Sequence, residues 1–420
     1  MLLEKPKLFR TYKEAFWVLG VLSLILSVRL LLLYWEYNEF IGKPFYYTHA
    51  LVLQQYTKQK HNKPYQVLKL RTKEGYTLYT TAHLKENLTN YKIRIRLIPD
   101  TSLRFWEYLR AFYIKSTIKE VYQKVETTKG KLLETLASQH QEREVISFYQ
   151  AIFLATPLDK ALREKIAMLG VSHLVALSGF HLSILWVVVY GLLLLLYQPL
   201  QQRYFPYRYS LIDLGILTII LLFGYLWFVE FPPSLLRSFA MLLIAWMALL
   251  LGIELVSFGL LGFIVIVLLA LFPRLIVSLG FWFSVSGVFY IYLILHWSKR
   301  VHKYIISFIF IPLGIFILMQ PIVHALFGIT TLWQLLSPPL SLLFTLFYPL
   351  VIALHLINMG GVMDSWLVWL FSLPKGYEEN ILSLELLIGY IILSLGAIGS
   401  RWLFIATLLL SFTYLLYILV

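Results

Sequence analysis

The sequence contains no cysteine and has few charged residues. Of its 420 residues, 14% are Asp, Glu, Lys or Arg, whereas 59% are hydrophobic. Without cysteine the chain cannot form disulfides, thiolate metal sites or a cysteine nucleophile. Soluble domains are about a quarter charged, so this composition predicts an integral membrane protein.

The net charge of +14 is concentrated in one stretch of the chain. Residues 36–170 carry 22 Lys and Arg against 13 Asp and Glu, a balance of +9. This surplus suits a polyanion or an anionic lipid surface, but a positive soluble face also occurs without any partner. Composition leaves both interpretations open.

Residues 15–35 form an apolar run that is long enough to cross a bilayer. No small-residue cleavage site follows it, which predicts an uncleaved anchor over residues 1–35 rather than a signal peptide. The positive-inside rule then places the N-terminus in the cytoplasm and residues 36–170 on the outer, periplasmic side. The preceding basic residues are Lys5, Lys7, Arg10 and Lys13.

Residues 36–100 have the pattern of a small β domain. Ile93, Ile95 and Leu97 alternate with Arg94 and Arg96, which is the period of a half-buried strand. A series of such short strands predicts a periplasmic OB-like β-barrel. The strand-like runs are residues 45–56, 65–72, 76–81 and 91–99, with Gly75 suited to a tight turn.

Residues 101–172 are predicted to be an amphipathic helical region on the periplasmic side. Trp106, Leu109, Phe112 and Tyr113 are spaced for one apolar helical face. A later helix is expected to start near Thr156-Pro157-Leu158-Asp159 and to stop at Gly170.

From residue 173 to residue 420 the chain is nearly all apolar. With the anchor, it predicts a polytopic α-helical membrane protein of about ten spans. Residues 358–381 fit an aromatic-rich helix in the membrane interface, on a side that the sequence leaves open. The expected spans are residues 180–197, 210–229, 235–251, 255–272, 278–297, 304–320, 340–357, 382–399 and 402–419.

A polar motif, residues 173–181, marks the entry to this apolar domain. His173, Ser178 and His181 lack a carboxylate or a further His at metal-ligand spacing, so we expect no metal site. Ser178 and His181 share a helix face, which leaves open an intramembrane hydrolase with these two as its reactive pair. The alternative is a hydrogen-bonded break, where Ser178-Gly179 turns the backbone into the membrane and both histidines line an entrance.

Two double prolines precede apolar helices. Pro232-Pro233-Ser234 can start a helix with unpaired N–H groups, and Arg237 follows one turn later. A helix N-terminus beside a guanidinium suits a phosphate. Ser337-Pro338-Pro339 opens a second such helix, and broken helices commonly line polar paths in membranes. Both pairs also fit simple turns between spans.

Several motifs, in order, resemble the ComEC family of competence proteins, the inner-membrane channels for incoming DNA. HLVALSGFH resembles the family signature, and FPPSLLRSFAM resembles its proline-serine-arginine helix with Arg237 in the arginine position. PRLIVSLGFWFSVSGV resembles the glycine-phenylalanine-serine span and carries Gly280, Phe281 and Ser284. The segments lie at residues 173–181, 231–241 and 273–288, and similar ones follow at 332–343 and 369–374.

The chain departs from this family pattern at three places. Glu230 stands where a glycine is expected, Trp282 and Phe283 replace a Gln-Leu pair, and an Asn expected soon after Pro339 is missing. The sequence also has no His-x-His-x-Asp-His cluster, so it is expected to be a short form without the metallo-β-lactamase-like domain. A nuclease, where one is needed, would be a separate protein.

The resemblance implies a channel that translocates single-stranded transforming DNA from periplasm to cytoplasm during natural competence. It further implies a periplasmic DNA receptor and a cytoplasmic ATP-driven motor, since the chain has no G-x-x-x-x-G-K-[ST] loop. We expect no enzymatic activity and no cofactor. Rival interpretations are the Ser178/His181 hydrolase, a lipid-handling enzyme and a transporter of small anionic or lipid-linked substrates. The partners otherwise expected are the bilayer and single-stranded DNA, and a homo-oligomer stays open.

Two groups of site residues follow from the motifs and the basic region. Tyrosines interleave with cations in residues 36–100, the combination by which OB-type domains hold single strands. The predicted DNA-binding residues are Lys58, Lys60, Lys63, Lys69, Arg71, Lys92, Arg94 and Arg96. The predicted channel entrance and path comprise His173, Ser178, Gly179, His181, Glu230, Pro233, Ser234, Arg237, Gly280 and Ser284.

Overall fold

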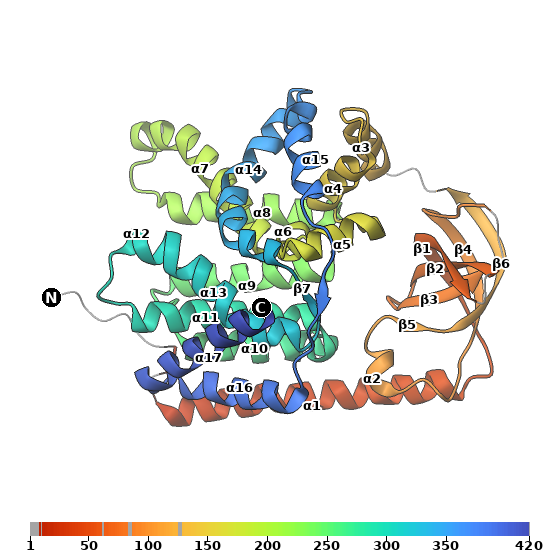
Figure 1. The fold of residues 1–420 in the computed structure, drawn as a ribbon, viewed down its shortest axis with the longest axis horizontal. Helices are drawn as coiled ribbons and strands as arrows, with labels where there is room; N and C mark the ends of the chain where they lie inside the picture. Colours follow the sequence, from red (N-terminus) through yellow and green to blue (C-terminus); the bar gives the residue numbers. More distant parts are fainter. Residues whose placement is uncertain (1–7, 10, 61–62, 83–85, 125–127, 420) are drawn as a thin grey trace. The chain divides into compact units, whose positions relative to one another are not determined.

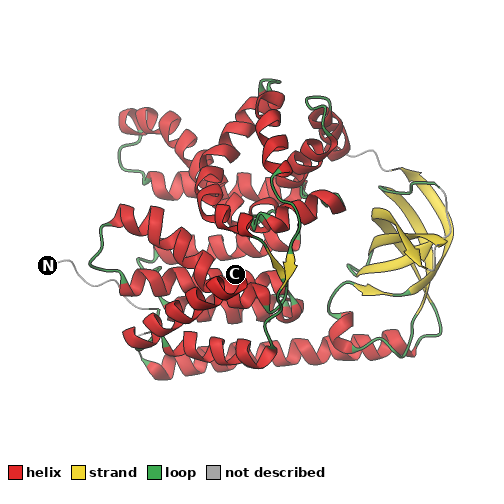
Figure 2. Cartoon of the chain, in the orientation of Figure 1, coloured by secondary structure: helices red, strands yellow, loops and turns green. Residues whose placement is uncertain are grey.

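The structure is a computed structural model that describes residues 8–9, 11–60, 63–82, 86–124 and 128–419. Its described part is mostly helical and divides into two compact units. The sheet unit contains Thr11–Gly130 and Val265–Leu279, and the membrane unit contains Lys131–Ile264 and Gly280–Val420. Figure 1 labels the elements, and Figure 2 shows that the strands gather in one sheet apart from a short ladder among the helices.

The sheet unit begins with a long apolar helix. Helix α1, Tyr12–Gly42, starts where Thr11 caps it and accepts a hydrogen bond from the Glu14 backbone N–H at 3.2 Å. Its most apolar window has no buried residue, as expected for a helix whose apolar surface faces lipid. The apolar helix predicted from the sequence is therefore confirmed, and it is long and apolar enough to span a membrane.

The predicted strands in residues 36–100 are confirmed. Gly75 sits in the turn between the second and third strands with φ +88°, a left-handed conformation that glycine adopts without steric cost. The strands are β1 Tyr46–Lys60, β2 Lys63–Thr72, β3 Thr77–Ala82, β4 Tyr91–Ile98, β5 Phe112–Tyr113 and β6 Lys115–Lys124.

The prediction of a closed β-barrel is wrong. The six strands form one sheet in the order β5-β3-β2-β1-β4-β6, with β5 and β6 at its two ends. Strand β5 pairs with β3 over only two residues, and β6 pairs with β4 at the other end of the sheet. Because β6 directly follows β5 in the chain, the continuous segment Phe112–Lys124 lies along both ends. A hydrogen bond of 2.8 Å between the hydroxyls of Thr80 and Ser116 links β3 to β6.

The helical prediction for residues 101–172 holds only in its later part. Residues 105–108 form a single turn, α2 (Phe105–Tyr108), and the chain then becomes strands β5 and β6. Residues 115–124 form a strand rather than a helix because they pair with β4. Without β6, the backbone N–H and C=O groups along that edge of β4 would have no partner strand. The helices are α3 Thr128–Ala137, α4 Arg143–Leu154 and α5 Lys160–Met168.

The core of the sheet unit joins the sheet to α1 and α2. Phe40 of α1 and Tyr108 of α2 pack on strand residues such as Leu68, Ile93 and Ile95, which are fully buried. The segment η1, Pro273–Val277, belongs to the same unit. Its Arg274 lies over the ring of Tyr76, 5.2 Å from the centroid, and over Tyr108 at 5.9 Å.

The membrane unit supplies most of the spans. Eight helices of the described chain, α1 included, are long and apolar enough to cross a bilayer. The sequence predicted about ten such helices, and the number is lower because two of the predicted segments form helices of only 14 and 13 residues. Those two are α10 Phe258–Leu271 and α16 Leu384–Gly396. The chain is a multi-pass helical membrane protein.

The remaining helices of this unit comprise long helices, most of whose ends lie within a few residues of the predicted span ends, and short helices that were not predicted. They are α6 Ser172–Val175, α7 Gly179–Tyr204, α8 Ser210–Phe228, α9 Pro233–Leu250, α11 Leu279–Trp297, α12 Lys303–Ile305, η2 Ile306–Phe310, α13 Ile311–His324, η3 Leu332–Leu336, α14 Ser337–Leu356, η4 Gly360–Met363, α15 Asp364–Ser372 and α17 Arg401–Leu419. A two-stranded ladder joins β7 Ile329–Thr330 to β8 Glu378–Glu379.

Local sequence signals set several of these ends. Both double prolines begin helices as predicted, since α9 starts at Pro233 and α14 at Ser337. Asp159 precedes α5, and Gly170 ends that region with φ +68°. The helix expected within residues 358–381 is α15, and its apolar face packs into the protein core through Leu367 and Phe371.

Candidate functional site

The motif of residues 173–181 builds the start of α7. Ser178 is the N-cap, with extended backbone, and its Oγ accepts a hydrogen bond from the Phe180 N–H at 3.3 Å. The His181 Nδ1 closes the turn by accepting the Ser178 backbone N–H at 3.4 Å. This is a capping box with histidine in the place of the usual Glu or Gln. The break in the backbone that the motif predicts is thus present.

His181 is fully buried between α7 and α14. Its ring meets Phe344 and Tyr348 edge to face, with centroid distances of 5.1 and 4.9 Å. In the described chain no side chain forms a hydrogen bond with its Nε2. The histidine therefore presents one nitrogen to the helix cap and leaves the other in aromatic surroundings.

Helix α9 begins against the same turn. Ser234 Oγ donates to the carbonyl oxygen of Leu177 at 2.6 Å, and Ser238 Oγ donates back to the Ser234 carbonyl at 2.9 Å. A Cβ atom added to Gly179 would lie 3.0 Å from the Ser238 hydroxyl. Glycine at 179 therefore lets the first turn of α7 approach the first two turns of α9.

Arg237 lies on α9 between this contact and the start of α11. The residue is 7% exposed, and its guanidinium lies 5.9 Å from the ring centroid of Phe281. A Cβ added at Gly280 would be 3.4 Å from Arg237 Nη2, so the guanidinium covers that glycine. The N-terminal turns of α7, α9 and α11 are thus linked through α9, and a buried cation lies among them. The helix dipoles add positive potential at these N-termini.

Four predicted path residues lie outside this cluster or at its margin. His173, on α6, pairs its Nε2 with Ser341 of α14 at 3.1 Å. Pro233 is the first residue of α9, and Ser284 lies one turn beyond Gly280 on α11. Glu230 is half-buried between α8 and α9 with φ +67°. That conformation favours glycine, which gives a physical reason for the glycine expected at this position.

Sequence reasoning missed the partners that surround the motif. Phe344 and Tyr348 were not singled out, although their spacing of four residues places them on one face of α14. Ser238, which fills the space beside Gly179, was also missed. An aromatic pair in an apolar helix is usually core, so only the tertiary contact with His181 distinguishes these two rings.

The predicted DNA-binding cations gather on one face of the sheet. Strand register aligns Arg71, Leu51 and Lys92 across three neighbouring strands, and cross-strand partners share a face. Lys69 precedes Arg71 by two residues and so points to the same face, opposite the buried one that carries Ile93 and Ile95. The cations on this outer face are Lys69, Arg71, Lys92, Arg94 and Arg96.

Tyrosines interleave with these cations, as the sequence predicted. Arg94 lies over Tyr47 at 5.7 Å and forms an ion pair with Glu120 at 3.1 Å, whereas Lys69 lies over Tyr79 at 5.9 Å. Lys58 is near the far end of β1, beside the ring of Tyr56. The side chains of the two other predicted residues, Lys60 and Lys63, lie outside the described residues.

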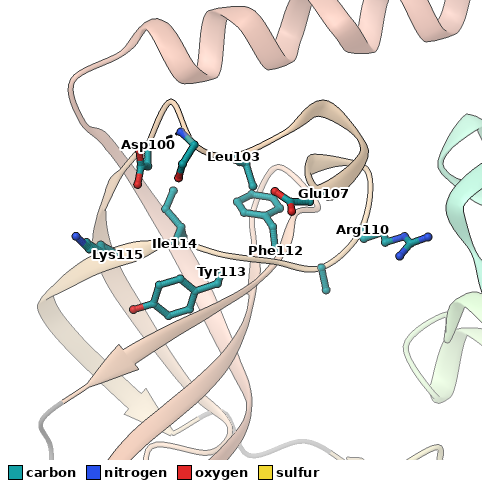
Figure 3. Close-up of a pocket in the computed structure, with 10 residues that line it drawn as sticks. Asp100, Leu103, Glu107, Arg110, Phe112, Tyr113, Ile114 and Lys115 are labelled. Carbon is teal, nitrogen blue, oxygen red and sulfur yellow. Dashed lines mark hydrogen bonds between the residues drawn. The ribbon is translucent and has the colours of Figure 1, made fainter. Parts of the chain in front are cut away.

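A cavity of about 350 Å³ is lined by the segment that joins β4 to β6, with residues of α2 and β5 in its wall (Figure 3). Its lining mixes charges, with Asp100 and Glu107 as well as Arg110 and Lys115. The two carboxylates serve local turns, since Asp100 accepts the Ser102 N–H and Glu107 accepts the Arg104 N–H. Because its lining carries both positive and negative side chains, this cavity suits a polyanion less well than the outer face of the sheet does.

The described residues contain no group of three or more His, Asp or Glu side chains placed to hold a metal ion. The membrane cluster around Arg237 has a cation, helix N-termini and hydroxyls, which favour contact with an anion.

These features define a class: a multi-pass helical membrane protein that carries a basic, tyrosine-rich β-sheet unit. A family model described as "Competence protein" matches residues 155–420. The match covers more than half of the sequence, and the chain belongs to this competence protein family. No curated protein and no solved structure gives a match. Membership confirms the resemblance that the motifs indicated and supports a role in DNA uptake, with DNA as the substrate.

Proposed function

We propose that this protein is a channel in the inner membrane that passes one strand of transforming DNA from the periplasm to the cytoplasm. The observation that carries the proposal is the linked start of three helices, α7, α9 and α11, around Arg237. Helix N-termini and a guanidinium both attract phosphate, and neither reads a base. A path for DNA of any sequence needs this property.

The sheet unit is assigned the role of receiving the strand on the periplasmic side. Its outer face offers five cations with Tyr47 and Tyr79 among them. Cations can follow the phosphates while aromatic rings stack on bases, and neither contact depends on sequence. Affinity for single-stranded DNA should therefore fall steeply as salt rises.

The hydrolase interpretation is the weaker one on geometry. A serine–histidine pair needs a group that orients the second nitrogen of the histidine. In this structure the Nδ1 of His181 faces Ser178 at 3.4 Å, and no side chain of the described residues forms a hydrogen bond with its Nε2. We assign Ser178 and His181 to the helix cap and the wall of the path, with no bond broken. We assign the driving force to an ATP-driven motor and the capture of DNA in the periplasm to a DNA receptor.

The test is natural transformation with chromosomal variants, scored separately for DNA in the periplasm and in the cytoplasm. A deletion strain, Ser178→Ala and His181→Ala should each stop entry into the cytoplasm while DNA still reaches the periplasm. His302→Ala, in an exposed loop, is the matched control and should transform normally. Membrane abundance of each variant is measured by immunoblot, so that loss of protein is distinguished from loss of transport.

Ser178→Asn separates the two mechanisms. Asparagine caps a helix about as well as serine but cannot act as a nucleophile. The channel predicts that this variant keeps most of its uptake, whereas a hydrolase would lose it. A deletion strain that transforms normally would overturn the proposed function.

A further inference from the structure

A largely buried cluster of three titratable side chains joins distant parts of the membrane unit. His140, between α3 and α4, places its Nδ1 2.9 Å from Asp364 Oδ1 and 3.0 Å from Oδ2. The Nε2 of His140 lies 3.0 Å from the Nε2 of His355, in the last turn of α14. The His355 Nδ1 lies 2.6 Å from the Val351 carbonyl oxygen. These contacts make one continuous chain of hydrogen bonds.

The geometry fixes how many protons the chain of bonds contains. A carbonyl oxygen only accepts, so His355 Nδ1 carries a proton. The two Nε2 atoms share one proton, and a further proton lies between His140 Nδ1 and the Asp364 carboxyl group. Three protons are therefore present, whereas an ionised Asp and two neutral histidines supply two. The fully bonded cluster holds one additional proton and has no net charge.

The surroundings make any other charge state costly. The side chain of His140 is 0% exposed and that of Asp364 is 20% exposed. The ring of Tyr149 stacks on His140 at 4.6 Å and meets His355 edge to face at 4.5 Å. If the cluster loses one proton, it carries a net negative charge, and one of its three contacts no longer has a hydrogen atom between the two polar atoms. Adding a proton leaves a buried positive charge that no acidic group among the described residues is placed to balance.

The titratable groups that the described structure places against the cluster are few. Tyr149 comes from α4, and burial, followed by the charge of Asp364, raises its pKa, so it stays neutral. The neighbouring polar groups do not titrate: Gln139 accepts the Gly360 N–H at 3.0 Å, and its amide donates toward the His355 carbonyl at 3.3 Å. Asn358 accepts from the same amide at 3.4 Å. The charge of the cluster therefore depends on its own three members.

We propose that His140, His355 and Asp364 form a proton-binding site that holds α15 docked on the membrane unit, and that loss or gain of one proton releases the helix. Asp364 is the first residue of α15, and beyond it Leu367 and Phe371 pack beside Phe148 of α4. The site thus acts at the point where α15 begins. It shares no residue with the Arg237 cluster, and the proposal does not depend on DNA transport.

The experiment measures undocking of α15 in the purified full-length chain in detergent micelles. The chain has no cysteine, so a single cysteine introduced by Leu367→Cys reports through its maleimide labelling rate. Leu367 is 1% exposed, whereas the adjacent Val368 is 41% exposed. The rate for L367C is divided by that for V368C at each pH, which cancels the pH dependence of the thiol itself. The ratio is followed over about pH 5 to 9, where histidine clusters titrate.

We expect the ratio to be lowest at an intermediate pH and to rise on both sides, by up to about tenfold for each pH unit, because one proton is linked to docking. The decisive variant is Asp364→Asn in both reporters. An amide donates to His140 Nδ1 without an additional proton, so this cluster is neutral with two protons. The alkaline rise should disappear while the acid rise remains.

Either of two results would overturn the proposal. One is a ratio in the native background that does not change with pH. The other is an alkaline rise that persists in Asp364→Asn, which would show that the proton of this cluster does not control release. Circular dichroism and gel filtration establish that each variant is folded, and the native-background titration stands even where Asp364→Asn fails to fold.

Discussion

Ser234 donates a hydrogen bond from its Oγ to the carbonyl oxygen of Leu177 at 2.6 Å, which ties the first turn of α9 to the residue before the α7 cap. The bond gives a partner to a carbonyl group at a break between helices. In a membrane, such a group has no water with which to pair. The spacing of the two helix starts therefore depends on this hydroxyl.

Replacing Ser234 should loosen this junction. We expect Ser234→Ala to lower the free energy of unfolding by about 0.5–1.5 kcal/mol, the usual range for a single hydrogen bond. Ser372→Ala is the matched control, because Ser372 Oγ bonds only the carbonyl of Trp369 in its own exposed turn. Its effect should be smaller. Thermal unfolding in detergent checks the difference, and equal losses in both variants would contradict it.

The left-handed backbone conformation of Glu230 supports a second prediction. Both Glu230→Gly and Glu230→Ala remove the carboxylate, but only glycine relieves the steric cost of φ +67°. Glu230→Gly should therefore be more stable than Glu230→Ala by about 1 kcal/mol. The comparison of the two variants is made by thermal unfolding. Equal stability would mean that the left-handed backbone carries no cost here.

Glu120 competes with DNA for Arg94 on the outer face of the sheet. It accepts a hydrogen bond from Arg94 at 3.1 Å and a second from the Tyr122 hydroxyl at 2.6 Å. We expect Glu120→Gln to raise the affinity for single-stranded DNA and Arg94→Ala to lower it. Fluorescence anisotropy over a salt series checks both, and the salt slope should change by about 0.7 for each phosphate that is newly bound or released. An affinity insensitive to both substitutions would remove this face from the assigned role.

Glu74 should make the sheet pH-sensitive. Burial opposes its ionisation, but hydrogen bonds, first from Thr48 at 2.7 Å and then from Tyr46 at 3.0 Å, hold its pKa below the ordinary value. A lowered carboxyl pKa stabilises the fold above the unfolded value of about 4.3. That stabilisation is lost as the pH falls through the lower folded value.

Glu74→Gln should therefore weaken the sheet at pH 7, and its difference from the native chain should shrink toward zero below about pH 4. Peptide-resolved hydrogen exchange over β1 measures this. Native and variant chains are compared at the same pH, so that intrinsic exchange rates cancel. A difference that stays constant with pH would exclude the carboxylate as its cause.

Much of the fold could be predicted because the relevant forces are local. Apolar runs, the two double prolines and Gly75 mark helices and turns wherever the chain carries them, so boundaries such as Pro233 and Ser337 were correct. Residues 112–124 were mispredicted as helical because their pairing with β3 and β4 is not encoded in local periodicity.

The sequence by itself determined that this is a multi-pass membrane protein of the competence type, since composition and ordered motifs do not depend on how the chain packs. The site was only half predictable. Ser178, His181 and Arg237 stand out as polar residues in apolar surroundings, yet their partners Phe344 and Tyr348 look like ordinary core. The tertiary structure alone brought His140 to His355 and Asp364 across more than 200 residues, because hydrogen bonds between buried groups depend on distance in space.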